Sequence, residues 1–224
     1  HNNQDDGVEM FGGAVDLRHL VLTGNSDDSM DYTDGWIGRA QFVIIQQSDD
    51  GDQGFEWDNR SSNNALLPRS NPRISNFTLI GRRNGAGSNT AGELYNGIVV
   101  DFGNACLNVD DNETFDRIGA TGAAGDEDLI IQSTVLDCLT NFKETAGDPV
   151  DLSTWFLGQA NNAEITHSMS GFTFIPGSTG VVPGATELAV TTTDVNALDS
   201  WFEPVTYIGA VEDSNDTWYQ GWTF

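Results

Sequence analysis

Four short stretches of the same design decide the fold: Val8-Glu9-Met10, Met30-Asp31-Tyr32, Phe55-Glu56-Trp57 and Leu107-Asn108-Val109. Each sets an acidic or amide residue between two apolar ones, directly after a loop. The first two steps along the chain are 22 and 25 residues, and the third is 52, or two coils. A period of 20–30 residues made of strands without helices is typical of a solenoid, most simply a parallel β-helix. Equivalent strands of successive coils then stack in register about 4.8 Å apart.

Longer apolar runs alternate with these triplets, and clusters of Gly, Asn and Asp separate them. Predicted strands cover residues 14–23, 40–47, 74–80, 94–102 and 129–136. Helical patterns occur at residues 148–159, where Asp148 is a candidate N-cap, and at residues 195–201. The sequence therefore predicts an all-β, right-handed parallel β-helix with one or two short helices. We expect one unit over residues 1–224, with regular coils at about 5–145 and an irregular capping region at about 146–224. Aromatic residues at the C-terminus, including Tyr207, Trp218, Trp222 and Phe224, are predicted to cap the last coil.

The composition is strongly acidic, with 24 Asp and 10 Glu against eight Arg and one Lys, and the net charge is −25. This balance argues against binding to nucleic acids or anionic membranes, which requires Lys and Arg opposite phosphate. No apolar run approaches 18 residues, so no membrane span is predicted. The polar start, HNNQDD, is not a signal peptide. We interpret the chain as mature, processed or a fragment, and more specifically as the C-terminal part of a longer protein.

The acidic residues of the triplets suggest a cation site. Because neighbouring residues of a strand point to opposite faces, Glu9, Asp31 and Glu56 should form one outward column, with Asn108 further along. Stacked carboxylates repel one another and need bound cations, raised pKa values or solvation. Adjacent loops offer more oxygen ligands, which is the ligand type calcium uses. The predicted calcium ligands are Glu9, Asp27, Asp28, Asp31, Asp34, Asp49, Asp50, Asp52, Glu56 and Asp58. The alternative is a solvated acidic rim, because the loops lack the EF-hand pattern.

Catalytic machinery is hard to assemble from this sequence. Its three histidines are His1, His19 and His167, and His19 shares a predicted strand face with Val15 and Leu17, which favours a packed core residue. Motifs for serine hydrolases, phosphate loops and zinc proteases are missing. A polysaccharide lyase would need a basic residue, and an inverting glycosidase only carboxylates. The candidate bases, which we interpret mainly as structural partners of carboxylates, are Arg39, Arg60, Arg69, Arg73, Arg82 and Arg83.

The two cysteines allow one disulfide bond. Cys106 follows one predicted strand and Cys138 ends the next long one, so adjacent coils should bring them within bonding distance. We predict a disulfide that closes a loop of roughly 30 residues and contributes about 3 kcal/mol. Two buried free thiols are the alternative.

Several stretches resemble a family of secreted bacterial proteins. They are MFGGAVD at 10–16, DDSMDYTDGWIGRAQF at 27–42, GFEWDN at 54–59, PRISNFTLIG at 72–81, YIGAV at 207–211 and GWT at 221–223. Members of this family are lipoprotein-type surface proteins of marine bacteria, some similar to surface-layer proteins of marine gammaproteobacteria. The resemblance implies a right-handed β-helix at the cell surface and carries no catalytic residues.

Together these features favour a structural role outside the cell. We expect a surface-layer or cell-surface assembly subunit that is stabilised by calcium, self-associates and is not an enzyme. The repeat is already under way at Val8, so residues 5–24 should be covered by earlier coils or by a neighbouring subunit. The alternative is a carbohydrate-active enzyme, either a polysaccharide lyase or a glycoside hydrolase, or a sugar-binding adhesin on the same scaffold. Surface polysaccharide is a further candidate partner.

Overall fold

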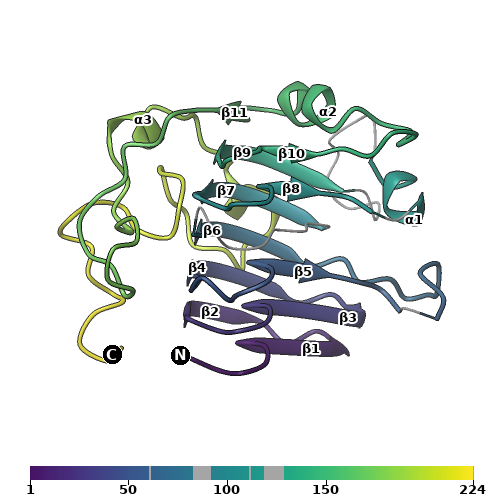
Figure 1. Cartoon of the computed structure of the whole chain (residues 1–224), viewed down its shortest axis with the longest axis horizontal. Helices are drawn as coiled ribbons and strands as arrows, with labels where there is room; N and C mark the ends of the chain where they lie inside the picture. The colour runs from purple at the N-terminus through teal and green to yellow at the C-terminus, as the bar shows by residue number, and fades with distance from the viewer. Residues whose placement is uncertain (61, 83–91, 111, 119–128, 224) are drawn as a thin grey trace.

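Parallel strands stacked in coils form the body of the molecule in the computed structural model (Figure 1). It describes residues 1–60, 62–82, 92–110, 112–118 and 129–223. Every strand pair assigned within this part of the chain runs parallel. The chain is therefore a stack of strands from successive coils, as the repeat predicts, and the two termini lie near the same end of the stack.

The predicted triplets form the smaller wall of the stack. Strands β1 (Val8–Gly13), β3 (Met30–Trp36) and β5 (Phe55–Trp57) make a three-stranded sheet. Glu9 pairs with Asp31, and Asp31 pairs with Glu56. Their neighbours Met10, Tyr32 and Trp57 are buried in the core. The 22- and 25-residue steps thus correspond to the in-register stacking of these triplets.

The fourth triplet lies in a separate two-stranded sheet. Strand β8 (Leu107–Asn108) pairs with β10 (Phe142–Lys143), which sets Asn108 beside Lys143 rather than beside Glu56. Residues 83–91, which come between β5 and β8 along the chain, lie outside the described part. A disulfide joins Cys106, just before β8, to Cys138, and their Cα atoms are 5.6 Å apart.

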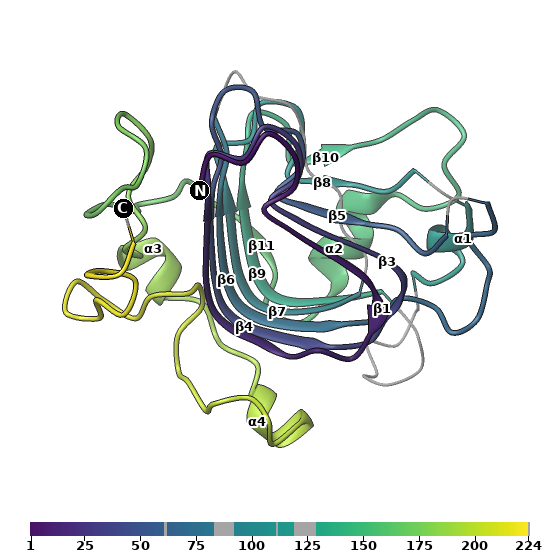
Figure 2. The same ribbon diagram turned by 90° about the horizontal axis from the view of Figure 1, so that it is seen from below.

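The larger wall is a six-stranded sheet that bends midway along each of its long strands (Figure 2). Its order is β11-β9-β7-β6-β4-β2. The strands are β2 (Leu17–Thr23), β4 (Arg39–Gln46), β6 (Arg73–Ile80), β7 (Glu93–Val100), β9 (Ile130–Asp137) and β11 (Ala163–Glu164). The five long strands of this sheet, β2, β4, β6, β7 and β9, coincide with the apolar runs in the sequence.

A column of left-handed residues causes this bend. Residues at equivalent positions of successive coils have φ between 53° and 61°, namely His19, Phe42, Asn76, Asn96, Ser133 and Asn161. The alternation of inward and outward side chains shifts at each of them. The prediction that His19 is packed in the core is therefore wrong: the left-handed backbone turns it outward, where it is exposed and stacks on Phe42 and Trp218.

The C-terminal region differs from the predicted cap. The helix α2 (Leu152–Gly158) is N-capped by Asp151, not by Asp148, and it inserts Leu152 and Phe156 at the far end of the core. Residues after β11, with the short helices α3 (Ala185–Leu188) and α4 (Val195–Leu198), pack along the outer face of the large sheet (Figure 2).

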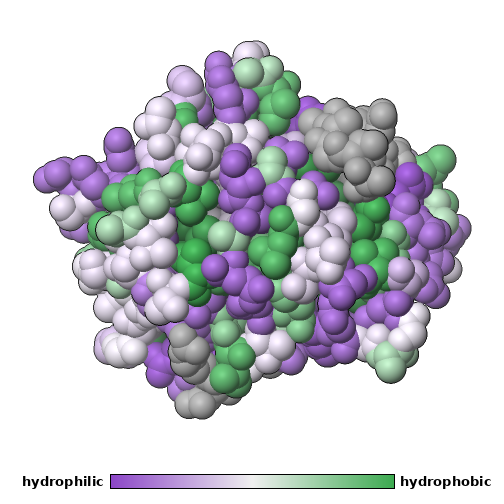
Figure 3. All heavy atoms as spheres, turned by 90° about the horizontal axis from the view of Figure 1, so that it is seen from above, coloured by the Kyte–Doolittle hydropathy of each residue, from purple (hydrophilic) through white to green (hydrophobic). Residues whose placement is uncertain are grey.

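The described C-terminal aromatic residues therefore do not cap the last coil, and Phe224 lies outside the described part of the chain. Trp218 instead contacts His19 in β2, in the first coil. The outer face of the large sheet is apolar at Ile44, Ile80, Ile98 and Val135, and these side chains form a second core with Val181, Val182, Ile208 and Tyr219. The tail lies there because this apolar face would otherwise be in water. Figure 3 views the molecule from the α2 end, where hydrophilic side chains lie between small separate hydrophobic areas.

Candidate metal centre

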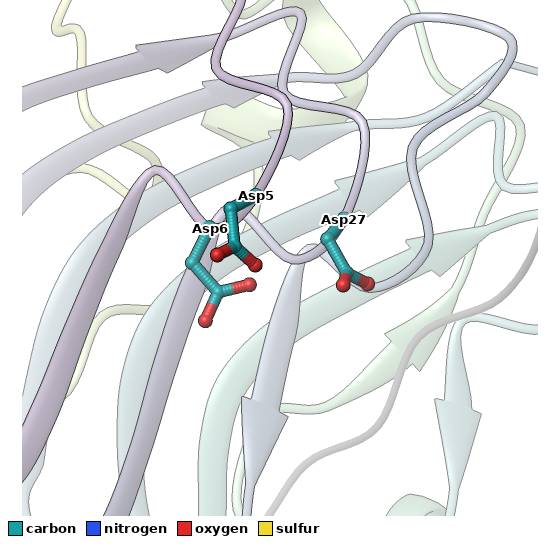
Figure 4. Close-up of side chains that lie close together, drawn as sticks. All are labelled: Asp5, Asp6 and Asp27. Atoms are coloured by element: carbon teal, nitrogen blue, oxygen red, sulfur yellow. The ribbon is translucent and has the colours of Figure 1, made fainter.

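Eight carboxylates from three successive coils meet on the outer side of the small sheet. We call this surface the carboxylate face, and it consists of Asp5, Asp6, Glu9, Asp27, Asp28, Asp31, Asp52 and Glu56. Strands β1, β3 and β5 supply its Glu9-Asp31-Glu56 column. The turns that precede these strands supply the other five residues, because they stack with the same period. Figure 4 shows Asp5, Asp6 and Asp27 with their carboxylates directed toward the same side.

The turns are held in register by their own carboxylates. The Asp28 N–H donates to Asp6 Oδ1 at 3.1 Å, and the Gln53 N–H donates to Asp28 Oδ1 at 2.6 Å. Backbone bonds from Gly7 N–H to the Asp28 carbonyl and from Asp52 N–H to the Asp27 carbonyl continue the same stacking. Each coil thereby fixes the position of the acidic side chains on the next.

Among the described residues, three groups of three carboxylates are close enough to share one cation. They are Asp5-Asp6-Asp27, Asp6-Glu9-Asp31 and Asp27-Asp28-Asp52, and in each group one oxygen per residue lies within 4.8 Å of the others. Six to eight oxygens around a spherical ion is the coordination that calcium takes. Exposed acidic groups are common without an ion, so these distances alone do not identify a cation site.

The burial of Asp31 is a second observation that favours a bound cation. This residue is 9% exposed, and its Oδ1 atom has no hydrogen-bond partner among the described residues. A buried carboxylate oxygen without a donor is costly, and a cation is one way to satisfy it. Burial raises the pKa of Asp31, and the negative charges of Glu56, Asp6 and Glu9 raise it further.

The pKa values of two neighbouring carboxyls, Asp28 and Asp6, are raised as well. Burial, with a hydrogen bond to the Glu56 carboxyl, raises the pKa of Asp28 well above its usual range. Burial also raises the pKa of Asp6 to about 6, with added repulsion from Glu9, Asp27 and Asp5. Because the fold holds these carboxyls together, their charges repel one another, and bound protons or a cation would relieve that repulsion.

Four predicted ligands lie away from the carboxylate face. Asp34 pairs with Arg60 at 2.8 Å, and Asp49 pairs with Arg82 at 2.9 Å. Asp58 lines a cleft that begins where β5 ends, and Asp50 is exposed on its turn. In each carboxylate–arginine pair the positive charge is already supplied by the protein, so these residues are poor choices for a shared ion.

The structure also adds Asp5 and Asp6, which the sequence analysis does not select. A usable signal exists: Asp5-Asp6 precedes Asp27-Asp28 by 22 residues, the step that separates Glu9 from Asp31. The segment before the first triplet can therefore be assigned as part of a repeated turn.

Most candidate bases are engaged with carboxylates. Arg39 Nη2 is 2.6 Å from Asp16 Oδ2, and Arg73 Nε is 2.8 Å from Glu93 Oε2. These partners raise the pKa values of both arginines, so each guanidinium holds its proton more firmly and is less available to accept one. Arg69 has no carboxylate partner within the described part of the chain, whereas Arg83 lies outside that part.

His167 lies between the large sheet and the C-terminal tail. Its Nε2 atom is 3.5 Å from Asp101 Oδ2 and 3.9 Å from Asp137 Oδ2. The hydrogen bond to Asp101 raises the pKa of the imidazole. This position, remote from the small sheet, favours a structural charge pair.

Comparisons with known proteins point to one family. A family model described as a pectate-lyase-like β-helix domain matches residues 1–223. Neither the curated proteins nor the solved structures contain a match. The family match supports the parallel β-helix part of the resemblance, and it carries nothing about marine surface-layer or lipoprotein-type proteins. Among the described residues, the helices are all too short or too polar to cross a membrane.

Proposed function

The chain belongs to the pectate-lyase-like β-helix domain family, and we propose that it is an extracellular, calcium-dependent carbohydrate-binding protein. The observation that carries the proposal is the carboxylate face, where a buried oxygen of Asp31 has no hydrogen-bond partner in the described part of the chain. The surface-layer role that the sequence suggests gains no support from the family match. We further infer that the coils are right-handed, as parallel strand crossovers almost always are.

The carboxylate face supports a route by which an acidic protein holds a saccharide through a bound cation. The small sheet and its turns offer ligands from one side of an ion, and calcium takes six to eight oxygens. Coordination positions on the open side remain for water or for oxygens of a ligand. A bound calcium ion therefore turns a repelling surface into one that accepts sugar hydroxyl or carboxylate groups.

We propose binding without cleavage. The candidate bases Arg39, Arg60 and Arg73 all have pKa values raised by carboxylate partners, which opposes proton abstraction. A secreted setting agrees with the disulfide between Cys106 and Cys138. Incubation with acidic and neutral polysaccharides, followed by measurement of new reducing ends and of unsaturated products, tests the absence of turnover.

Calcium titration calorimetry on the chelated protein tests the metal site. The variant Glu9→Gln should weaken calcium binding, because Glu9 belongs to the group around Asp31. The matched control Asp34→Asn removes one acidic charge from a residue paired with Arg60 and should bind calcium as the wild type does. Binding to a panel of immobilised polysaccharides, with calcium or with chelator, then tests the function. Equal binding in both conditions, or no calcium uptake, would contradict the proposal.

A further inference from the structure

A cleft between the first coil and the C-terminal tail is lined without Asp, Glu, Lys or Arg. It encloses about 140 Å³ at the end of β2, on the end of the stack that holds both termini (Figure 1). Those four residue types make up 19% of the chain, and the clefts lined by Asp58 and by Asp101 contain arginines as well. We call the uncharged cleft the tail cleft, and its lining residues are His1, Val21, Thr23, Phe174, Trp222 and Thr223.

One wall of the tail cleft is an exposed tryptophan in a fixed orientation. Trp222 is 57% exposed, and its ring stacks on that of Trp218 with centroids 6.4 Å apart. Its indole N–H donates to the Trp218 carbonyl at 2.7 Å. Trp218 is anchored in turn, because its own indole N–H donates to the Ala210 carbonyl at 2.9 Å. The tail therefore holds the Trp222 ring in place and leaves much of it uncovered, although an apolar ring in contact with water is unfavourable.

A second aromatic ring, that of Phe174, is also fixed in the lining. It packs edge to face against Phe172, with centroids 4.9 Å apart, and against the buried ring of Tyr219 at 6.0 Å. The backbone of Phe174 is held by the large sheet, because its N–H donates to Gln46 Oε1 at 2.8 Å. Both aromatic walls are thus in position before a ligand binds, which lowers the entropic cost of binding.

The rest of the lining offers hydrogen-bonding groups and one aliphatic side chain, Val21. Thr23 Oγ1 lies 2.6 Å from His1 Nδ1, and the Thr223 hydroxyl donates to the Tyr219 carbonyl. A hydroxyl oxygen can accept a hydrogen bond while it donates another, so both threonines can contact a ligand hydroxyl. The tail cleft therefore combines aromatic faces with neutral polar groups, which is the composition of a small-ligand site rather than of a charge pair.

We propose that the tail cleft binds a neutral sugar ring, stacked on Trp222. The C–H groups on one face of a pyranose pack against the electron-rich face of an aromatic ring, and its hydroxyls match the neutral polar groups of the lining. A hydrocarbon ligand would cover His1 and Thr223 without replacing their contacts with water. An anionic sugar would find no Lys or Arg in the lining, and the net charge of −25 repels it.

The choice of a saccharide rests on the proposed carbohydrate-binding function, to which the tail cleft adds a second site. This site differs from the carboxylate face in its ligand class. It also needs no calcium, because none of its lining residues is a carboxylate.

Calorimetry of the full chain in chelator tests the inference, with β-1,4-linked tetrasaccharides of glucose, mannose and galactose as neutral probes and tetragalacturonate as the acidic comparator. Wild type should bind at least one neutral probe, and should bind tetragalacturonate at least about tenfold more weakly. Trp222→Ala should weaken binding of the neutral probe by about tenfold or more, and Trp222→Phe, which keeps a ring, should weaken it less. Leu198→Ala is the matched control, because it shortens another exposed apolar side chain of the tail outside the cleft lining.

The outcomes separate the tail cleft from the carboxylate face. If no neutral probe binds in chelator, or if Trp222→Ala binds as wild type or as Leu198→Ala does, the assignment of the tail cleft is wrong. Calcium-dependent binding of the polysaccharide panel by Trp222→Ala would then still support the proposed function, because this variant leaves the carboxylate face intact. If the panel shows no calcium dependence with this variant while wild type binds a neutral probe in chelator, the carboxylate-face proposal fails and the tail cleft stands. An unchanged Tm of each variant shows that the fold is intact.

Discussion

Replacing Asp31 by Asn should stabilise the calcium-free protein and destabilise the calcium-loaded one. Asp31 shares a group with Asp6 and Glu9 in which the nearest oxygens lie within 4.8 Å. Two unit charges at that distance repel by about 3 kcal/mol at an effective dielectric constant of about 20. Asp31 takes part in two such pairs. If only a third of this repulsion is realised, its removal stabilises the calcium-free fold by about 2 kcal/mol and raises Tm by about 4–8 °C.

In calcium, wild type should have a higher Tm than Asp31→Asn, which reverses the order expected without calcium. At a free calcium concentration of 100 times Kd, binding to the folded state stabilises wild type by about 2.7 kcal/mol, or about 5–11 °C in Tm. Asp31→Asn loses a charged ligand and most of this gain. Thermal melts of both proteins, in chelator and in calcium, measure the four Tm values.

Without calcium, the difference in stability between wild type and Asp31→Asn should depend on pH. The pKa of Asp31 is raised in the folded state, so ionisation of this group costs stability as the pH rises above the ordinary range of an aspartate. The advantage of Asp31→Asn should therefore vanish near pH 3.5 and grow toward pH 9. A calcium-free variant that melts below wild type at every pH, or an equal calcium-induced rise of Tm in both proteins, would show that repulsion at Asp31 and its relief by calcium do not control stability.

Three further predictions concern other parts of the fold. Replacing Cys106 and Cys138 by Ala opens a loop with a sequence separation of 32 residues and should cost about 3–4 kcal/mol, measured by urea unfolding; an unchanged midpoint would contradict this. His167→Gln should lower Tm more at pH 5.5 than at pH 8.5, because the raised imidazole pKa gives stability that is lost as pH rises through it, and a pH-independent difference would exclude the charge pair with Asp101. The open edge of β1 carries Phe11, which is 68% exposed, so ultracentrifugation should show concentration-dependent dimers that Phe11→Ser weakens; a monomer with slow amide exchange throughout residues 5–24 would rule this out.

The candidate site is only partly a consequence of the repeat. The sequence places Glu9, Asp31 and Glu56 in one column because strand neighbours alternate faces and successive coils share a register. It also selects Asp34 and Asp49, which lie in similar acidic loops, but these residues pair with Arg60 and Arg82. Whether an acidic side chain meets an arginine or another carboxylate depends on loops that cross between coils, and no periodic pattern encodes those contacts.

The coil period, the stacked triplets and the positions of the long strands follow from the amino-acid sequence, because backbone hydrogen bonding between parallel strands requires equal spacing of equivalent residues. Departures from that period depend on contacts between segments that are distant in the sequence. The left-handed residue at His19 turns a predicted core side chain to the surface. The tail carries Trp218 back to β2 because the outer face of the large sheet is apolar and must be buried somewhere. Both outcomes depend on surfaces that exist only after the coils have stacked.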